Sequence, residues 1–514
     1  MWTILYEIVF SSVFLLLSTL VLLYFYGVRT YGFWKKRGVP YVEPKYPFFG
    51  NTFETALSIK PAYVAQLEIY KRFIGQRFVG VFTFTNPTLF VRDPELVEAV
   101  MIKDFTSFYN RGTASNHEQE PLSAHLFHLE NQKWKILRQK LSPTFTSGKL
   151  KGMHQQLVDC SDALVKYING FAVRDEPVEM REVMAKFTTD VIGSCAFGLN
   201  TNAMSDPDSE FRKNGRKIFE SSIKRRFFSL LKMNFPQLQK YVNLKSIDQS
   251  TEDFFMNLVK STMLYREANN VTRNDFVQLL MELKKQEQNL TKTDQQDEDE
   301  LIIDDKIIAA NAFVFFVAGF ETTASTLSYC LYELSLNQEI QEQAYQHVVS
   351  VLSKHGGQVS YEAIREMTFL KQIFSETLRK YPPVPELLRK STKDYVIPGT
   401  SVAIPKGTRV TIPVYSLHYD SKYFPEPEKF KPERFDREKN KIKIGTYLPF
   451  GDGPRICIGE RFAKMEIQVA LVKLLTKYRF TLNSKTISPL VYNSSTILLM
   501  PIGGIWIDLH KRDE

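Results

Sequence analysis

The sequence predicts a mainly α-helical protein with small β-sheets, preceded by one transmembrane helix. Long stretches place apolar residues at three- and four-residue steps, one short stretch is rich in β-branched and aromatic residues, and an uncharged apolar run lies at the N-terminus. Over 514 residues, hydrophobic residues make up 44% and charged residues 24%. These are globular values, and they exclude a disordered, collagen-like or polytopic membrane protein.

The uncharged run at 8–26 is the first element. At ~1.5 Å rise per residue it approaches the ~30 Å hydrocarbon thickness of a bilayer. Glu7 precedes the run and bulky aromatic residues end it, which favours a retained anchor over a cleaved signal peptide. Basic residues follow the run, so the positive-inside rule places the rest of the chain in the cytosol. These basic residues are Arg29, Lys35, Lys36 and Arg37.

We predict an anchor at 1–28, a hinge at 29–50 and one large domain at 51–514. The hinge is basic, and its closely spaced prolines hold the chain extended. The cysteines are widely spaced without a C-x-x-C pair, which argues against a disulfide scaffold and a structural zinc site and agrees with a cytosolic domain. Glycosylation sequons, which would be modified only in the lumen, begin at Asn270, Asn289 and Asn493.

Within the large domain, residues 78–91 predict a hairpin, because β-branched and aromatic residues lie on either side of Asn86 and Pro87. The polar stretch 286–300 has almost no apolar content and predicts a solvated loop. Helical spacing of apolar residues is clearest at 187–197, 307–336, 361–380 and 460–478.

The stretch 224–236 mixes basic and apolar residues, which suits contact with an anionic bilayer; an ordinary amphipathic surface helix is the alternative. Lys and Arg total 66 against 57 Asp and Glu, a net charge of +9 that also suits an acidic partner. Nucleic acid is not an expected partner, because no stacking module or Lys/Arg-rich tract accompanies the aromatic residues.

The segment 449–459, PFGDGPRICIG, directly precedes a predicted helix. Its glycines, Gly451, Gly453 and Gly459, let the backbone pass close to a flat ligand. Cys457 lies where this loop meets the helix N-terminus, and free N–H groups there, together with Arg455, are expected to lower the pKa of its thiol. A buried structural cysteine would explain Cys457 but not the arrangement around it.

This segment resembles the haem-binding loop F-x-x-G-x-R-x-C-x-G of the cytochrome P-450 family. The matching residues are Phe450, Gly453, Arg455, Cys457 and Gly459. The resemblance implies the cytochrome P-450 fold for the domain at 51–514, haem b as cofactor, and Cys457 as the axial ligand of the haem iron.

A second resemblance lies in the central helix predicted at 307–336, which contains AGFETT. It is similar to the family's oxygen-activation motif. Ala318 and Gly319 lack bulk, so that a ligand can approach the backbone, and the Thr322 hydroxyl can donate and accept hydrogen bonds at that opening. The resemblance implies that Glu321 and Thr322 relay protons. A helix kink without chemistry is the alternative.

Buried charges complete the pattern. Glu376 and Arg379 lie at i,i+3, and with Arg434 they resemble the interlocking E-x-x-R and P-E-R-F elements of the family, which implies structural roles. His418, a lone histidine in a predicted loop, is expected to be a surface or hydrogen-bonding residue rather than an iron ligand. The residues that the resemblance places on the haem propionates are Trp134, Arg138, Arg389, Arg455 and Arg111.

The resemblance implies a microsomal monooxygenase that inserts one atom of O2 into lipophilic substrates. The expected electron donor is an NADPH-dependent cytochrome reductase, with cytochrome b5 as a possible second donor, and the expected location is the endoplasmic reticulum membrane, with the domain on the cytosolic side. RGVPYVEP and DYVIPGT look most like the insect branch that metabolises xenobiotics such as plant toxins or insecticides. The alternatives are a haem-thiolate isomerase or dehydratase, and a membrane-anchored haem-binding or ligand-sequestering protein without turnover.

Two surfaces are expected to serve this activity. A basic patch should attract an acidic partner; it consists of Lys133, Lys135, Lys140, Arg461 and Lys464. A large apolar pocket should select substrates by shape and hydrophobicity. Its expected lining is the loop after Arg111, the helix face with Phe313, Phe316 and Phe320, and the segments 384–388 and 497–499.

Overall fold

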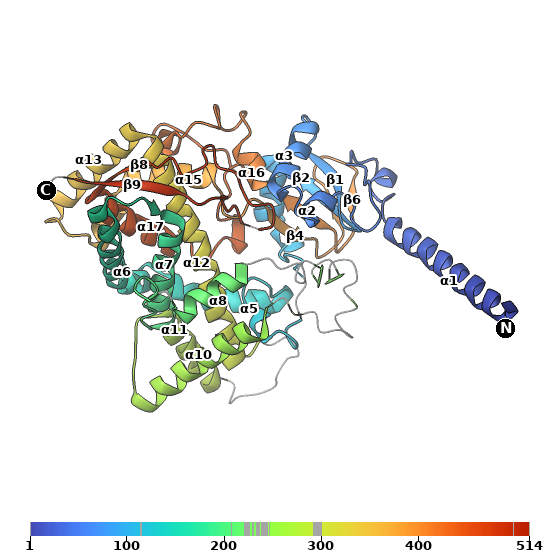
Figure 1. The fold of residues 1–514 in the computed structure, drawn as a ribbon, viewed down its shortest axis with the longest axis horizontal. Helices are drawn as coiled ribbons and strands as arrows, with labels where there is room; N and C mark the ends of the chain where they lie inside the picture. Colours follow the sequence, from blue (N-terminus) through green and yellow to red (C-terminus); the bar gives the residue numbers. More distant parts are fainter. Residues whose placement is uncertain are drawn as a thin grey trace.

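The computed structural model of the protein describes residues 2–113, 116–206, 208–219, 227–228, 231–232, 237, 245, 247–290, 301–496 and 498–512. Helices make up most of the body, and one apolar helix projects away from it at the N-terminal end (Figure 1). Most of the stretch 224–236, for which membrane contact was predicted, lies outside the described residues.

The projecting helix is α1 (Trp2–Val28), and only its Gly27 is buried. Two helices are long and apolar enough to cross a membrane, α1 and α12 (Asp305–Leu336), among the residues described. Most of the apolar part of α12 lies inside the body, which identifies it as a core helix. The N-terminal helix therefore remains the one candidate anchor in the described chain.

The segment after α1 is docked on the body. Trp34 is fully buried, and its indole N–H donates to the carbonyl of Val81 at 3.0 Å. Gly80 donates its N–H to the Pro40 carbonyl at 2.8 Å and accepts from the N–H of Val42 at 2.9 Å. The predicted hinge is thus hydrogen-bonded to a strand of the first sheet.

That sheet has the strand order β1-β2-β7-β4. Strands β1 and β2 form the predicted antiparallel hairpin, but the turn lies at Phe84 and Thr85, and Asn86 and Pro87 belong to β2. Phe84 takes the left-handed conformation, with φ 53°, that such a tight turn requires. The strands are β1 (Phe78–Thr83), β2 (Asn86–Val91), β7 (Arg409–Ile412) and β4 (Leu387–Lys390).

Two smaller sheets complete the β-structure. One has the order β3-β9-β8, and the other pairs β5 with β6. The strands are β3 (Val178–Glu179), β9 (Trp506–Lys511), β8 (Tyr478–Leu482), β5 (Tyr395–Val396) and β6 (Ala403–Ile404).

Many of the helices pack around α12, whereas α2 and α3 lie beside the first sheet (Figure 1). The longer ones are α3 (Ala62–Arg72), α5 (Asn131–Leu141), α6 (Ser147–Arg174), α7 (Met180–Ile192), α8 (Glu210–Phe219), α10 (Gln249–Asn269), α11 (Phe276–Leu290), α13 (Gln338–Lys354), α15 (Thr368–Lys380) and α17 (Glu460–Leu475). The shorter ones are α2 (Phe53–Ala56), α4 (Pro94–Glu98), α14 (Tyr361–Glu366) and α16 (Val414–His418).

Several predicted boundaries were wrong. The helix expected at 361–380 breaks at Met367, whose ψ of 67° cannot continue an α-helix, and this gives α14 and α15. The stretch at 460–478 ends as a helix at Leu475, and Tyr478 begins β8. The loop expected at 286–300 begins inside α11, which runs to Leu290. Residues 291–300 of that loop lie outside the described chain.

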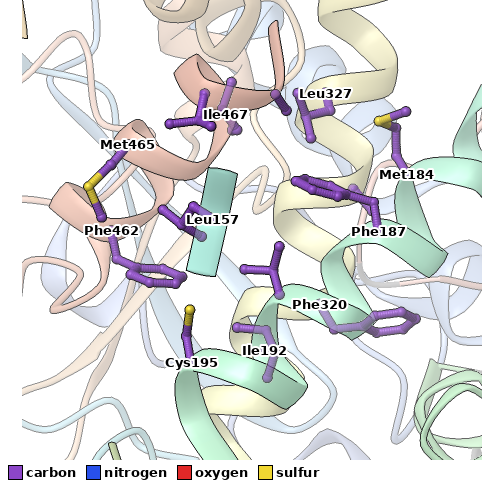
Figure 2. Close-up of a cluster of buried hydrophobic side chains, with 14 of the residues drawn as sticks. Leu157, Met184, Phe187, Ile192, Cys195, Phe320, Leu327, Phe462, Met465 and Ile467 are labelled. Carbon is purple, nitrogen blue, oxygen red and sulfur yellow. The ribbon is translucent and has the colours of Figure 1, made fainter. Parts of the chain in front are cut away.

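The core holds α12 in place from several sides. Figure 2 shows Phe187 of α7 and Leu327 of α12 close to Ile467 of α17, with Leu157 of α6 near Phe462. These side chains are buried members of one hydrophobic cluster. Because packed interiors deform little, this cluster fixes which face of α12 each neighbour meets.

The docked hinge gives a first prediction. Trp34→Ala should lower the free energy of unfolding by about 3–5 kcal/mol, because it empties a buried aromatic site and removes a hydrogen bond. Thermal unfolding of the purified protein measures this loss. Trp2→Ala, at a position 81% exposed on α1, is the control and should change nothing; an equal midpoint for the two variants would contradict the docking.

Candidate active site

The loop 449–459 packs against the backbone near Met101. Gly451 and Gly453 have φ of 75° and 68°, in the left-handed region. A Cβ on Gly453 would lie 1.9 Å from the carbonyl oxygen of Met101, in η2 (Ala99–Lys103), so only glycine allows this packing. The N–H of Cys457 donates to the Phe450 carbonyl at 2.9 Å and closes the loop.

The thiol of Cys457 lies deep in the protein but keeps an accessible surface. Burial raises its pKa, and this effect outweighs a hydrogen bond from the backbone of Gly459 and the nearby charges of Arg111 and Arg138, which lower it. The expectation of a lowered pKa was therefore wrong for the protein alone, because desolvation dominates. Coordination to a metal cation would still hold the deprotonated form.

One face of α12 is also accessible within the body. Most residues of this part of α12 are buried, but four keep solvent-accessible surface: Val314, Val317, Ala318 and Thr322. Their spacing of three and four residues places them on one face. The Thr322 hydroxyl donates to the Ala318 carbonyl at 2.5 Å. Ala318 and Thr322 thus lie together at an opening, as the motif predicted.

Gly319 serves packing instead. A Cβ at this position would lie 2.5 Å from the Cδ1 atom of Ile192 in α7. The missing side chain of Gly319 therefore allows α7 and α12 to approach, and only Ala318 contributes to the opening.

The predicted aromatic lining of the pocket was wrong. Phe313, Phe316 and Phe320 are buried on another face of α12. Phe316 packs against Phe255 of α10, with ring centroids 5.0 Å apart, and against Phe211 of α8 at 6.0 Å. At 3.6 residues per turn, these phenylalanines cannot share the face of Ala318 and Thr322. Val384 and Leu388 of the predicted lining are accessible, Leu499 is buried and residue 497 is not described.

Guanidinium groups gather near Cys457 without carboxylate partners. Arg111, Arg138, Arg389 and Arg455 form no salt bridge within the described residues. Burial, together with repulsion from Arg389 and Arg138, lowers the pKa of Arg455 to about 9, although Glu130 opposes this. Burial lowers the pKa of Arg389 to about 10, and burial and the other guanidiniums depress that of Arg111.

Several nitrogen atoms of this arginine cluster are buried without a hydrogen-bond partner: Nε and Nη1 of Arg455 and Nε of Arg389. The bonds that do exist go to backbone carbonyls, from Arg455 to Leu129, from Arg389 to Leu388 at 2.8 Å, and from Arg111 to Phe127 at 3.1 Å. Arg455 also stacks over the indole of buried Trp134, 4.5 Å from its centroid.

These residues fit a haem. A dianionic ligand would supply acceptors for the orphaned guanidinium nitrogens and relieve their mutual repulsion. An accessible thiol and an accessible small-residue helix face suit an iron ligand and a flat group. The donor set of this site therefore matches the cofactor that the loop resemblance implies.

A second group of buried charged side chains, which lies outside the cysteine loop, has all its charges paired. Arg379 binds Glu376 in a bidentate manner at 2.7 and 2.8 Å, and both residues are fully buried. Arg434 of η8 (Pro432–Phe435) adds a contact to Glu376 at 3.3 Å. Arg379 donates further to the carbonyls of His418 and Pro427. The Glu376, Arg379 and Arg434 side chains thus join, as predicted.

His418 is buried in α16 and links this network to the cysteine loop. Its Nε2 accepts from the N–H of Leu448 at 2.9 Å, and its Nδ1 donates to the carbonyl of Arg379 at 3.1 Å. Burial and the nearby Arg379 lower its pKa to about 3. The histidine is therefore a neutral hydrogen-bonding residue, and its expected surface alternative is excluded.

Sequence reasoning missed the partner of Glu321. This buried carboxylate accepts from Arg181 of α7 at 2.7 Å and from the Ser325 hydroxyl at 3.3 Å. Arg181 carries no motif, and no sequence signal pairs it with a residue 140 positions away.

The predicted basic patch is partly free. Lys133, Lys135 and Arg461 are exposed, Lys464 is paired with Glu460 at 2.5 Å, and Lys140 donates to the Leu301 carbonyl at 3.3 Å.

Comparisons with known proteins agree with the site. The family model of cytochrome P-450 matches residues 40–507. Probable cytochrome P-450 6a14 of Drosophila melanogaster is 41% identical and covers 95% of this chain and 97% of its own length. Cytochrome P-450 6a2 of the same species is 40% identical over 98% of this chain and 100% of its own length. Cytochrome P-450 6j1 of Blattella germanica is 39% identical, with 96% of each chain covered.

The buried histidine gives a prediction about pH. Because the folded state holds His418 neutral, the unfolded state binds more protons, and stability contributed by this residue falls as pH drops below about 6.5 towards about 3. Between pH 6.5 and 5 the loss should be about 2 kcal/mol. His418→Gln, which can make both hydrogen bonds, should show a loss smaller by that amount in chemical unfolding. Parallel pH dependences for the two proteins would contradict the assignment.

The arginine cluster predicts that one substitution does not harm the stability of the haem-free protein but weakens haem retention by the haem-bound protein. Arg455→Gln should leave the haem-free protein as stable or more stable, because it removes a repelled, unsatisfied cation. The same change should speed haem transfer to apomyoglobin about tenfold. Arg461→Gln, at an exposed position, is the control for both measurements. Slower or unchanged haem release from Arg455→Gln would contradict the predicted role.

Proposed function

The chain belongs to the cytochrome P-450 family, and we propose that it oxidises lipophilic foreign compounds with electrons passed from NADPH by a membrane-bound flavoprotein reductase. As a member of this family it is a haem-thiolate monooxygenase and binds haem b. The observation that carries the proposal is the juxtaposition of an accessible thiol with guanidiniums that lack an anion.

We assign the haem to residues of this chain. Cys457 is the proposed iron ligand, and the arginine cluster with Trp134 is the proposed propionate site. When bound, the haem activates O2 for insertion of one oxygen atom into a substrate, and a thiolate ligand favours O–O cleavage. Phe450, Gly451, Gly453 and Gly459 shape the loop that presents the thiol, and Ala318 leaves room on the opposite helix.

Proton delivery is the task we assign to Glu321 and Thr322. The overall reaction consumes a proton: RH + O2 + NADPH + H⁺ gives ROH + H2O + NADP⁺. The Thr322 hydroxyl lies at the accessible face, where its oxygen can accept from a water while its hydrogen is held by Ala318. Arg181 holds the Glu321 carboxylate in place one residue away from Thr322, and we assign this carboxylate the relay of protons towards that hydroxyl.

Substrate selection is expected to rest on apolar surface. Val314, Val317 and Ala318 present apolar groups on α12, Val384 presents one ahead of β4, and Leu388 presents one on β4 itself. A site lined in this way selects by shape and hydrophobicity with few fixed hydrogen bonds. Plant toxins, insecticides and lipophilic endogenous molecules have the matching chemistry.

Electron transfer should use the basic patch. Lys133, Lys135 and Arg461 are exposed, and they lie on α5 and α17, the helices that carry Trp134 and follow Cys457. An acidic surface of a reductase, or of cytochrome b5, would be attracted to them.

For the location, we propose that α1 spans the endoplasmic reticulum membrane and that the body lies on the cytosolic side. The helix exposes apolar side chains along its length, and the basic residues follow it. Docking of the hinge through Trp34 would hold the body close to the membrane surface.

The proposal is tested by reconstitution with NADPH and reductase. Purified holoprotein in lipid should hydroxylate a lipophilic probe only when both are present. Turnover of a peroxide without NADPH would favour the isomerase or dehydratase alternative, and binding without any turnover would favour the sequestering protein.

Within that assay, Thr322→Val should separate NADPH use from product formation. Loss of the hydroxyl removes a proton-handling group, so product per NADPH should fall roughly tenfold or more while hydrogen peroxide rises. Thr326→Val is the matched control, since that buried hydroxyl only donates to the Thr322 carbonyl at 2.7 Å. Equal coupling in the two variants would refute the role of Thr322.

Topology is tested by glycosylation. Asn270 and Asn493 are exposed, so a lumenal body would be modified there. We expect no shift in mobility after endoglycosidase treatment of microsomal protein. A sequon added ahead of α1 is the positive control and should be modified; modification of Asn270 or Asn493 instead would invert the topology.

A further inference from the structure

A carboxyl group lies in the apolar segment beside β4. Glu386 directly precedes this strand, and its carboxylate accepts from the side-chain amide of Gln66 in α3 at 2.5 Å. Neither residue belongs to a motif, and the two are 320 positions apart.

This carboxyl group lacks a cation. Within the described part of the chain, Glu386 forms no salt bridge, and its one hydrogen bond comes from the neutral amide of Gln66. Burial raises the pKa of Glu386. A buried carboxylate is normally paired with a basic side chain, so the absence of one here leaves a preference for a positive group unsatisfied.

A second acceptor lies beside it. The amide oxygen Oε1 of Gln66 is buried and has no hydrogen-bond partner. Glu386 nevertheless keeps some accessible surface, as Cys457 does. Glu386 can therefore be reached by a ligand, whereas the Gln66 oxygen beside it is enclosed and unsatisfied.

The surroundings are apolar and adjoin the active site. Val384 and Leu388, on either side in the sequence, are 37% and 40% exposed. Leu387, the next residue, lies 3.9 Å from where a Cβ of Gly451 would be, in the cysteine loop. The Pro383 carbonyl accepts from the N–H of Leu499 at 3.4 Å, so the C-terminal loop closes over the start of the segment.

We propose that Glu386 and Gln66 form a subsite for the positively charged nitrogen of a lipophilic amine, which makes such amines preferred substrates. This inference rests on the proposed function, the oxidation of lipophilic molecules. The carboxylate would pair with the ammonium group, and the accessible Val384 and Leu388 side chains would contact its hydrocarbon part. A neutral molecule of the same shape would leave the acid unpaired and would gain only the apolar contacts.

A pair of isosteric ligands tests this directly. The first is a phenylbutyl trimethylammonium ion, whose quaternary nitrogen cannot coordinate iron, and the second is the hydrocarbon in which carbon replaces that nitrogen. Binding to holoprotein in lipid nanodiscs is measured by calorimetry. Glu386→Gln should weaken binding of the cation about tenfold or more and leave binding of the hydrocarbon unchanged.

Matched variants keep the result interpretable. Glu68→Gln removes an exposed carboxylate from the same helix as Gln66, one that pairs with Lys60 at 2.9 Å, and should leave both affinities unchanged. Glu386→Asp keeps the charge and should retain a preference for the cation even if Glu386→Gln fails to fold. Unchanged cation affinity in Glu386→Gln, or an equal loss for both ligands, would overturn the proposal.

Failure of the proposed function would look different. If wild-type protein with NADPH and reductase oxidises the hydrocarbon but shows no preference for the cation, the amine subsite is wrong and the monooxygenase stands. If neither ligand is oxidised although both bind, the substrate class of the proposed function fails, and the Glu386 subsite is judged by the affinities alone.

Discussion

An uncompensated positive charge inside the protein is the constraint from which the site can be understood. Arg111, Arg138, Arg389 and Arg455 come from separate elements, and the fold brings them near one thiol without supplying a salt bridge in the described chain. Buried guanidinium nitrogens without partners are costly. The α5 helix, β4 and the cysteine loop are therefore arranged around an anionic ligand, and the protein alone leaves that requirement unmet.

A second set of buried charges differs from the arginine cluster, because all of its members are paired. Glu376, Arg379 and Arg434 are as deeply placed, yet their polar atoms find partners in each other and in backbone carbonyls. His418 then joins this network to the backbone of Leu448, just ahead of the loop. Satisfied charges hold the cysteine loop in place, whereas the unsatisfied ones, at the arginine cluster and at Glu386, are where we propose that ligands bind.

Motifs with fixed spacing could be predicted from the sequence, and pairings across the fold could not. The cysteine loop and the central helix carry local patterns, so their residues could be singled out from the sequence, and the arginines that the resemblance named lie near one another in the fold. The prediction that Phe313, Phe316 and Phe320 line the pocket was wrong, because these side chains lie on the face of α12 that packs into the core. Arg181 with Glu321 and Gln66 with Glu386 carry no local signal, since long-range packing alone brings them together. The raised thiol pKa of Cys457 also follows from burial, which spacing does not reveal.

The proposed function depends most on Cys457 as the iron ligand, and the spectrum of the reduced protein with carbon monoxide tests this assignment most directly. Wild-type protein should give the red-shifted Soret band of a thiolate-ligated haem. Cys457→Ala should bind haem weakly and lack the band, whereas Cys330→Ala, a change at a buried cysteine of α12, should keep it. A wild-type protein that binds haem without this band, or a Cys457→Ala protein that retains it, would contradict the assignment.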